Sequence, residues 1–311
     1  MPTFGDLNKQ QLYVDLVDVL NTLFGMHPGF RAAHAKALVC KGTFSPSQDS
    51  ATLSRAQHFK SDVPVTVRFS NGTGVPNIPD ADPNATPKGI AIRFHTSNGE
   101  TDLIAHSANG FPVPTAEEFL LLLRAIAASG PGAAKPTPVE QYLGSHPRTL
   151  AYVQMPKPTP ASFATENYFG LHAFRFINDK REGHFGRYFI KPVAEVKHLS
   201  AEEAAKQSPN FLFEELPKRL AKAPVQFKLF VQLTQKGDPT NDASQPWPAE
   251  RYQMELGTLS LTAALPDSAE AEKKLIYDPV RLIDGIELGD DPLPLDRSGV
   301  YAVSFVRRNP D

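Results

Sequence analysis

The sequence predicts an α+β fold in which an antiparallel β-barrel core carries inserted and flanking helices. Two segments, beginning at Val63 and Gly89, alternate apolar and polar residues with a period of two, which is typical of half-buried strands. Segments with helical spacing are inserted between such strands, a pattern that favours an α+β barrel. The 29 prolines among the 311 residues fall between the periodic segments and favour long, ordered loops.

The first expected element is an amphipathic helix from Leu7 to Phe24, because leucines and valines recur there at helical spacing. Asp6 is its expected N-cap, and Gly25 marks its expected end. Two strands follow, one from Val63 to Arg68 and one from Gly89 to His95.

In the next part of the chain, a helix from Ala116 to Ala128 is predicted by a capping box, in which Thr115 is followed three residues later by Glu118. The proline-rich stretch from Gly130 to Pro160 is expected to be irregular. Further strands are expected at His172 to Ile177, Gly186 to Lys191, Val225 to Thr234 and Met254 to Thr262, and further helices at Ala201 to Gln207, Phe211 to Ala221 and Leu295 to Arg308.

No internal repeat or linker divides the chain, so we expect a single domain over residues 1–311. The N-terminal helix would lie within residues 1–26, and the barrel with its functional site within residues 27–308. A net charge of −2 and the lack of a long basic run argue against nucleic acid as a partner. The single cysteine, Cys40, excludes an internal disulfide and a cysteine-rich metal site.

The sequence also bears on the compartment. It has no stretch of ~18 apolar residues, so we expect no membrane span. The first residues carry Asp6, Asp15 and Asp18 and no uninterrupted apolar core, so they do not form a signal peptide. We therefore expect a soluble protein, cytoplasmic as the sequence stands and periplasmic if a signal peptide has been removed.

The segment Arg297-Ser-Gly-Val-Tyr301 carries the clearest chemical signal. A spacing of four places the guanidinium and the phenol on one helix face. The pair could simply be an exposed arginine packed over a tyrosine ring. Alternatively, because a tyrosine of ordinary pKa near ~10 binds ferric iron only as the phenolate, the arginine could stabilise that charged form. Tyrosinate is a known haem ligand.

Further motifs, weak when taken singly, agree with this one in order and spacing. Together they resemble the core of the haem catalases and, more closely, the short catalase-related peroxidases. The likeness runs from about residue 27 to residue 308. It is carried by Arg31-Ala-Ala-His34-Ala-Lys, Pro64-Val-Thr-Val-Arg68-Phe-Ser70, Pro87-Lys-Gly-Ile-Ala-Ile-Arg-Phe-His-Thr96, Asp102-Leu-Ile, Asn109-Gly-Phe-Pro-Val113, Tyr277-Asp-Pro-Val280 and Arg297-Ser-Gly-Val-Tyr301.

The resemblance implies a catalytic role for three residues. His34 is expected to be the distal histidine, which moves the proton of hydrogen peroxide from one oxygen to the other. Ser70 is expected to fix the imidazole of His34. Asn109 is expected to be the distal amide that polarises bound peroxide.

The resemblance also implies a haem b cofactor with its iron. Tyr301 is the expected axial ligand of that iron, and Arg297 is its charge partner. Arg31, Arg68 and Arg308 are expected to hold the haem propionates, as guanidinium–carboxylate pairing requires.

The chain departs from the family pattern at several positions. Ala37 stands where the family has a glycine, and Phe305 stands where large catalases have a histidine. A few extra residues between Asp102 and Asn109 make His106 an alternative for the distal amide. Asn109 is favoured because Pro112 and Val113 follow it, as the pattern requires.

The function implied is a haem-dependent peroxidase or catalase that reduces hydrogen peroxide, with organic peroxides as further substrates, through an oxyferryl intermediate and in response to oxidative stress. Hydrogen peroxide and a small organic electron donor are the expected partners, and a homodimer is the expected assembly. Because the chain is short, we expect a wider entrance to the haem than in large catalases, lined by residues 77–84 or 130–160.

Two alternatives remain open. The first is an enzyme like the allene oxide synthases, which rearrange fatty-acid hydroperoxides; these carry a threonine before the distal histidine, where this chain has Ala33. The second is a haem-binding barrel without catalytic activity. The presence of His34, Tyr301 and the three propionate arginines argues against it.

Overall fold

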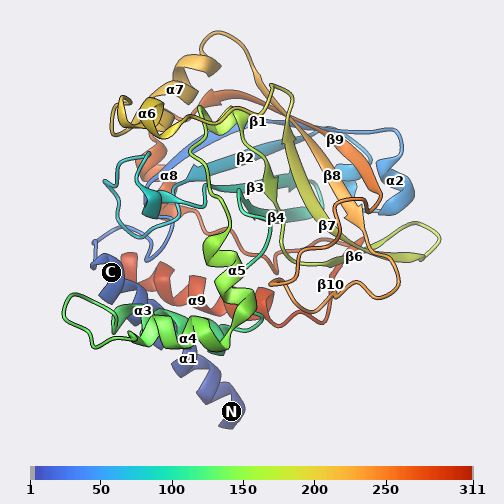
Figure 1. Cartoon of the computed structure of the whole chain (residues 1–311). Helices are drawn as coiled ribbons and strands as arrows, with labels where there is room; N and C mark the ends of the chain where they lie inside the picture. The colour runs from blue at the N-terminus through green and yellow to red at the C-terminus, as the bar shows by residue number, and fades with distance from the viewer. Residues whose placement is uncertain (1–3, 310–311) are drawn as a thin grey trace.

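The centre of the computed structural model, which describes residues 4–309, is a closed antiparallel barrel (Figure 1). Neighbouring strands follow the order β1, β2, β3, β4, β5, β7, β8 and β9, and β9 pairs with β1 to close the ring. Two short strands, β6 and β10, extend the sheet from β7. The strands are β1 (Ala37–Pro46), β2 (Val63–Ser70), β3 (Gly89–Thr96), β4 (Gly99–His106), β5 (Tyr168–Phe169), β6 (Phe174–Ile177), β7 (Gly183–Pro192), β8 (Val225–Leu233), β9 (Gln253–Ala264) and β10 (Ile286–Leu288). This confirms the predicted α+β barrel.

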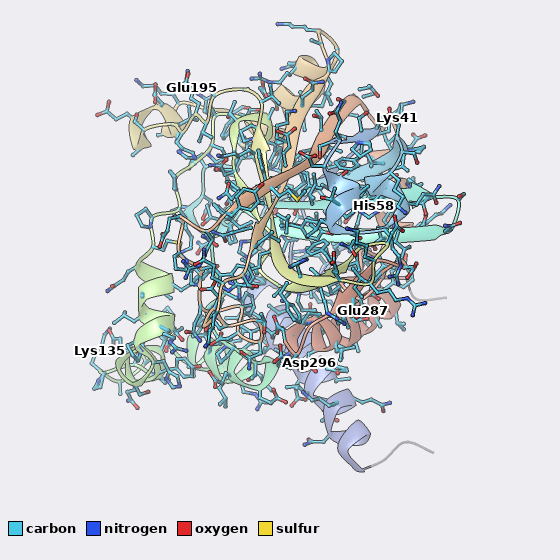
Figure 2. All side chains as sticks on the ribbon, turned by 90° about the vertical axis from the view of Figure 1, so that its right-hand side faces the viewer. Lys41, His58, Lys135, Glu195, Glu287 and Asp296 are labelled. Carbon is cyan, nitrogen blue, oxygen red and sulfur yellow. The ribbon has the colours of Figure 1, made fainter. Side chains whose placement is uncertain are left out.

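The barrel interior explains why the period of two was visible in the sequence. In the antiparallel register, Val67 lies opposite Ile92 and Val65 opposite Phe94, and all four side chains are buried. Their polar neighbours along each strand point to the other face. His58, which Figure 2 labels, is buried among the rings of Phe44, Phe59 and Phe94, and its centroid lies 4.6 Å from that of Phe94. It belongs to the packed core of the barrel.

A layer of helices covers one end of the barrel (Figure 1). It consists of α1 (Phe4–Phe24), α3 (Ala116–Ala127) and α9 (Leu293–Arg308), which share an apolar core that includes Leu16, Leu20 and Leu120. A Cβ atom at Gly299 of α9 would lie 2.2 Å from the ring of Tyr13 on α1, so these two helices can approach this closely only because residue 299 is glycine.

The predicted end of α1 and the predicted start of α3 are both present in the structure. Gly25, with φ of +83°, ends α1 as predicted. Asp6 is not its N-cap, because the helix already begins at Phe4. Thr115 caps α3 and accepts a hydrogen bond from the backbone N–H of Glu118 at 3.2 Å, as predicted, but within residues 4–309 no return bond to the Glu118 side chain completes the predicted capping box.

The stretch from Gly130 to Pro160 is not irregular throughout, and this prediction was wrong. It contains α4 (Pro138–Ser145) and α5 (Pro147–Gln154). Both prolines stand in the first turn of their helices, where a missing N–H costs no hydrogen bond and the fixed φ favours the helix. Thr137 and Glu140 complete a capping box at the start of α4.

The remaining helices are small and lie between strands. The predicted pair is present as α6 (Ala201–Ala205) and α7 (Phe211–Leu220), whereas α2 (Ser50–Leu53) and α8 (Ser268–Lys274) were not predicted. Strands β1 and β4 were also missed. None of the helices in residues 4–309 has both the length and the apolar character that crossing a membrane requires.

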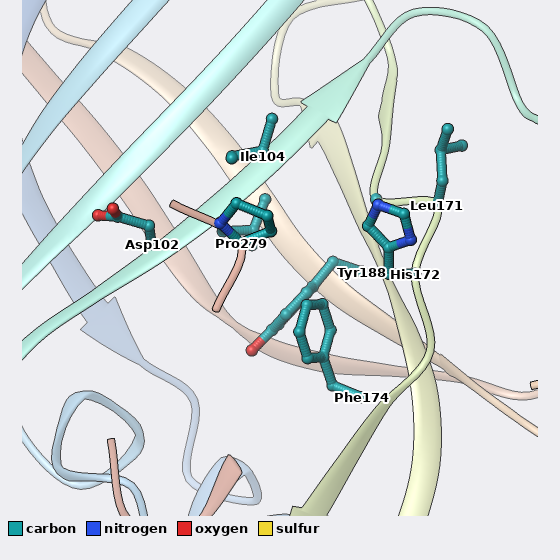
Figure 3. Close-up of a pocket in the computed structure, with 9 residues that line it drawn as sticks. Asp102, Ile104, Leu171, His172, Phe174, Tyr188 and Pro279 are labelled. Atoms are coloured by element: carbon teal, nitrogen blue, oxygen red, sulfur yellow. The ribbon is translucent and has the colours of Figure 1, made fainter. Parts of the chain in front are cut away.

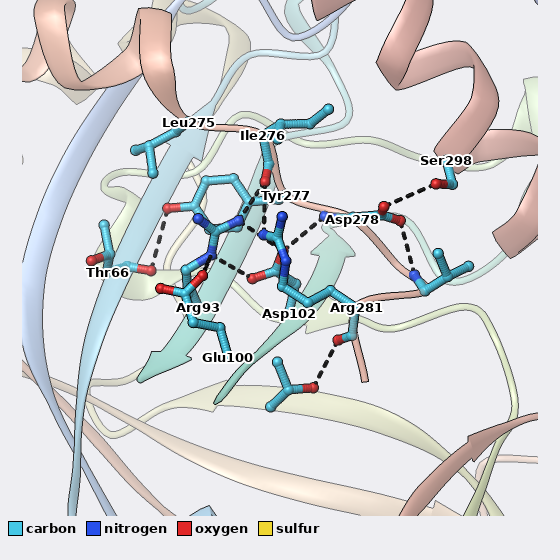
Figure 4. A network of polar contacts seen from close by, with 12 residues as sticks. Thr66, Arg93, Glu100, Asp102, Leu275, Ile276, Tyr277, Asp278, Arg281 and Ser298 are labelled. Carbon is cyan, nitrogen blue, oxygen red and sulfur yellow. Dashed lines mark hydrogen bonds and ion pairs between the residues drawn. The ribbon is translucent and has the colours of Figure 1, made fainter. Parts of the chain in front are cut away.

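A buried network ties the chain between α8 and α9 to the barrel wall (Figure 4). Asp102 of β4 accepts hydrogen bonds from Arg93 at 2.8 Å, from Arg281 at 2.7 Å and from the backbone N–H of Asp278 at 2.8 Å. The carboxylate of Asp278 in turn accepts a hydrogen bond from Ser298 at 2.9 Å. Since Ser298 belongs to α9, this network fixes the position of that helix relative to the barrel.

Candidate active site

A cavity of about 730 Å³ lies where strands β2, β3 and β4 meet the helical layer. Most of its wall is apolar, formed by α1, α3 and residues such as Ile90 and Ile104 of the barrel. All of the site residues predicted from the sequence except one contribute to the lining: His34, Ser70, Arg31, Arg68, Arg297, Arg308 and Tyr301. The fold therefore brings together positions that are up to 277 residues apart in the sequence.

On α9, the side chains of Arg297 and Tyr301 contact each other as their spacing predicts. The phenol oxygen of Tyr301 accepts a hydrogen bond from Nε of Arg297 at 3.0 Å and another from Nη2 at 2.6 Å. Two donors of one guanidinium group therefore converge on a single oxygen atom.

Two residues that the sequence did not reveal extend this pair. Nη1 of Arg297 lies 2.6 Å from Nε2 of His172, and Nδ1 of His172 lies 2.8 Å from the carboxylate of Asp291. Because a guanidinium can only donate, Nε2 of His172 accepts, and its proton is on Nδ1, which donates to Asp291. Burial lowers the pKa of His172, although Asp291 opposes this, and the ring is neutral. The carboxylate of Asp291 and the guanidinium of Arg297 are thus linked through one imidazole, and Arg297 in turn contacts Tyr301.

His172 also borders a second, much smaller cavity (Figure 3). This cavity has a volume of about 10 Å³ and is lined by Asp102, Phe174 and Tyr188 among others. Such a volume is about the minimum that can hold one water molecule. It is therefore not a second substrate site.

At another part of the main cavity, two arginines share one carboxylate. Nε of Arg31 lies 2.6 Å from Oε1 of Glu272 on α8, and Nε of Arg68 lies 2.7 Å from Oε2. Burial alone would raise the pKa of Glu272, but Arg68 and Arg31 together outweigh it and bring the pKa to about 2. Glu272 is therefore ionised, and it fixes both guanidinium groups.

Arg308 joins this cluster, and within residues 4–309 it has no carboxylate partner. Its Nη2 donates to the backbone oxygen of Leu275 at 2.6 Å, while its buried Nε has no hydrogen-bond partner within the described part of the chain. Three guanidinium groups and the single carboxylate of Glu272 leave two positive charges at this end of the cavity. An anionic group with two carboxylates would balance them.

His34 lies on the loop that leads into β1, with an unusual backbone. Its φ is +55°, a left-handed conformation that few residues other than glycine adopt. Arg68 donates a hydrogen bond to the carbonyl oxygen of His34, and the N–H of Ala35 donates to Thr73 at 3.0 Å. Strain of this kind persists only where the surroundings hold it, and it is common at functional sites.

The imidazole of His34 is held by Ser70, as expected. Its Nδ1 lies 3.0 Å from the hydroxyl oxygen of Ser70, at the end of β2. Burial, followed by the nearby charge of Arg68, lowers the pKa of His34 to about 3. The ring is therefore neutral at pH 7 and can accept a proton.

The predicted position of Asn109 needs correction. Its side chain is exposed and does not line the cavity, whereas His106 does. The reason lies in the register of the barrel, since His106 is the last residue of β4 and lies opposite Gly89 of β3. Asn109 comes three residues after the strand has ended, on the loop that leaves the barrel.

Comparison with known proteins agrees with this geometry. The family model described as catalase matches residues 28–309. The chain belongs to the catalase family. A catalase-related peroxidase from Mycolicibacterium paratuberculosis is 36% identical over 94% of this chain and 93% of that protein. One from Synechococcus elongatus is 33% identical over 94% of this chain and 87% of that protein. The catalase of Pseudomonas syringae pv. syringae is 27% identical over 88% of this chain but only 56% of that protein.

Members of the catalase family depend on haem, and the residues of this chain fit that cofactor. The two excess positive charges of the arginine cluster match the two propionates of a haem, and the unpaired Nε of Arg308 is one donor for them. In residues 4–309, no cluster of three or more His, Cys, Asp or Glu side chains could hold a metal ion by itself. A single ligand such as Tyr301 is sufficient where a porphyrin supplies the others.

Gly89 offers a first test of the distal geometry in this catalase-family site. A Cβ atom there would lie 2.6 Å from the hydroxyl of Ser70 and 2.9 Å from Nδ1 of His34. Gly89→Ala should therefore displace the imidazole and slow the reaction with peroxide by up to about 10²-fold, while the far-ultraviolet circular dichroism stays unchanged.

The matched control is Gly130→Ala, because nothing lies within 4 Å of a Cβ atom at that position. The control should react at the wild-type rate in stopped-flow measurements. Equal rates for both variants would show that the contact between residue 89 and His34 is unimportant.

Proposed function

We propose that this protein is a haem-dependent peroxidase and catalase that reduces hydrogen peroxide, with haem b as its cofactor. Membership of the catalase family supports the reaction class. The observation that carries the proposal is the meeting, in one cavity, of a tyrosine paired with an arginine and a neutral histidine anchored by a serine.

In this proposal, α9 provides the proximal side of the haem. Tyr301 would hold the haem iron through its phenol oxygen, which accepts two hydrogen bonds from Arg297. Arg31, Arg68 and Arg308 bind the propionates. Haem supplies the redox chemistry that cleaves the O–O bond, while the protein sets the ligand, the pocket and the protons.

His34 handles the proton of the substrate. Its Nδ1 contacts Ser70, so Nε2 is the nitrogen left for the peroxide. Nε2 would accept a proton from one peroxide oxygen and return it to the other, which leaves as water when the O–O bond breaks and haem supplies the two electrons. General acid–base catalysis of this kind contributes typically ~10²–10⁴-fold.

Ala33 supports this reaction over the rearrangement of fatty-acid hydroperoxides. It lines the cavity next to His34 with a methyl group and offers no hydroxyl to that imidazole. The position therefore lacks the threonine on which the allene-oxide alternative depends.

The wall that α3, α4 and α5 add to the cavity supports an organic electron donor. Ile126, Val139, Leu143 and Val153 line it, so the stretch 130–160 contributes to the cavity wall, whereas residues 77–84 do not. Ile126 and Val153 are 41% and 51% exposed, which places them at the mouth. An apolar, open mouth suits an aromatic reductant.

We accordingly expect measurable oxidation of a bulky phenol or diammonium dye, and oxygen release per haem well below that of large catalases. Both rates should be measured on one preparation of known haem content, after a Soret-region spectrum. Rapid oxygen release without dye oxidation would show that the mouth is closed to organic donors, leaving a catalase only.

Val153→Trp tests whether the organic electron donor enters through this mouth of the cavity. It should reduce dye oxidation several-fold more than peroxide consumption, because it narrows the mouth for the larger molecule. Val196→Trp is the control, since Val196 is 40% exposed and does not line the cavity.

We also propose that residues 1–311 form one domain, with the N-terminal helix within 1–26 and the barrel and haem site within 27–308, and that two copies form a homodimer. Light scattering of the haem-loaded protein tests the assembly.

A further inference from the structure

His106 shares the cavity with His34 but comes from a different element. It is the last residue of β4, where its backbone pairs with Gly89 on one side and Phe169 of β5 on the other. Gly89 is also the residue whose missing side chain leaves room for the imidazole of His34. The barrel therefore places the two histidines on either side of the same glycine.

One nitrogen of His106 has a fixed role. The backbone N–H of Ala108 donates to Nδ1 of His106 at 3.2 Å. A backbone N–H cannot accept a hydrogen bond, so Nδ1 must be the unprotonated nitrogen of the neutral ring. The proton is then on Nε2, which makes no hydrogen bond within residues 4–309 and is free for a ligand.

His34 differs in this respect. Its Nδ1 partner is the hydroxyl of Ser70, which can either donate or accept. When Ser70 accepts, Nε2 of His34 is the bare nitrogen that proton transfer from peroxide requires. His34 can therefore exchange a proton during turnover, whereas His106 cannot become a base at Nε2 without breaking its bond to Ala108.

The surroundings keep His106 in the neutral state. Burial, followed by the charge of Arg297, lowers its pKa to about 3, and His172 and Lys157 act in the same direction. Because the N–H of Ala108 can only donate, its hydrogen bond requires an unprotonated Nδ1 in the neutral ring. The neutral Nε2–H form is thus the only one that this environment allows near pH 7.

We propose that His106 is a distal hydrogen-bond donor, whose Nε2–H binds the oxygen of a haem ligand while His34 acts as the base. Its imidazole, held in one tautomer, donates a hydrogen bond as an amide N–H would. It neither gains nor loses a proton during the reaction. This inference rests on the proposed haem function and assigns a role to a residue that the sequence pattern had left as the second choice.

Cyanide binding to the ferric haem protein tests the role without turnover. His106→Leu removes the donor, whereas His106→Asn restores an N–H in a smaller side chain. We expect cyanide affinity, measured by Soret titration, to fall about tenfold to a hundredfold in His106→Leu, the range for one hydrogen bond to a charged group, and to stay within a few-fold of wild type in His106→Asn. The exposed His184, replaced by leucine, is the control and should bind as wild type does.

The tautomer itself gives a second readout, which remains available even if His106→Leu does not fold. In the wild-type ferric cyanide complex labelled with ¹⁵N-histidine, one exchangeable proton should lie on Nε2 of His106, and its signal should be missing in His106→Asn. A proton on Nδ1, or wild-type cyanide affinity in a haem-loaded His106→Leu, would overturn the inference. Loss of haem binding in the wild type itself would instead refute the proposed function.

Discussion

Tyr301→Phe should lose most of its haem, or retain it with a spectrum that shows a weaker axial ligand. The change removes only the phenol oxygen, which is the atom that two nitrogens of Arg297 contact. Without it, the protein would offer the iron no anionic ligand at this position, and the guanidinium of Arg297 would lose the acceptor for two hydrogen bonds. Haem content per chain and the ferric Soret spectrum measure this directly.

A matched control is Tyr13→Phe. The hydroxyl of Tyr13, on α1, donates a hydrogen bond at 3.0 Å to Asp296, which lies on α9 as Tyr301 does. Tyr13 itself does not line the cavity. This variant should keep its full haem content and an unchanged spectrum. If Tyr301→Phe were equally unchanged, Tyr301 could not be the iron ligand. Arg297→Ala should have a smaller effect, because it removes two hydrogen bonds to the phenol oxygen but leaves that oxygen in place.

The second large effect is expected for His34→Ala. This variant should keep its haem, because the ligand and the propionate arginines are intact, and should react with peroxide about 10²-fold more slowly or worse. Stopped-flow mixing with hydrogen peroxide measures the rate. Ser70→Ala should fall between wild type and His34→Ala, since it removes only the partner of Nδ1.

The exposed His184, replaced by alanine, controls for the loss of an imidazole elsewhere in the barrel. Wild-type kinetics in His34→Ala would remove this residue from the proton path. A larger loss in His106→Leu than in His34→Ala would reverse the roles that we give to the two histidines.

The parts of the fold that the sequence predicted are those governed by local periodicity. Strands β2 and β3 alternate clearly because only one of their faces packs into the barrel, and in α9 the spacing of four brought Arg297 to Tyr301. The helices α4 and α5 were missed because each begins with a proline, and prolines gathered in one stretch were interpreted as loop residues. Pro138, which follows Thr137, is in fact the first residue of α4.

The candidate site was harder to predict where it depends on partners far apart in sequence. His172 and Asp291 are 119 residues apart, and no spacing rule connects them. Glu272 lies on α8, a segment rich in charged residues that the sequence alone suggests is exposed. Only the fold brings Glu272 to Arg31 and Arg68. Asn109 was preferred to His106 from the residues that follow it, whereas strand register, which the sequence does not display, decides which of them reaches the cavity.

The unbalanced charge of the arginine cluster lowers the stability of the chain in the cell until haem binds. A newly synthesised chain that has not yet acquired its cofactor must fold around two positive charges that lack counterions, and such charges are costly to bury. Haem binds the folded state and so raises its free energy of unfolding. The increase grows with the logarithm of the free haem concentration. Chains that fail to load should open more often and reach proteases sooner. The abundance of the enzyme would then follow the availability of iron and porphyrin, so that idle copies do not accumulate.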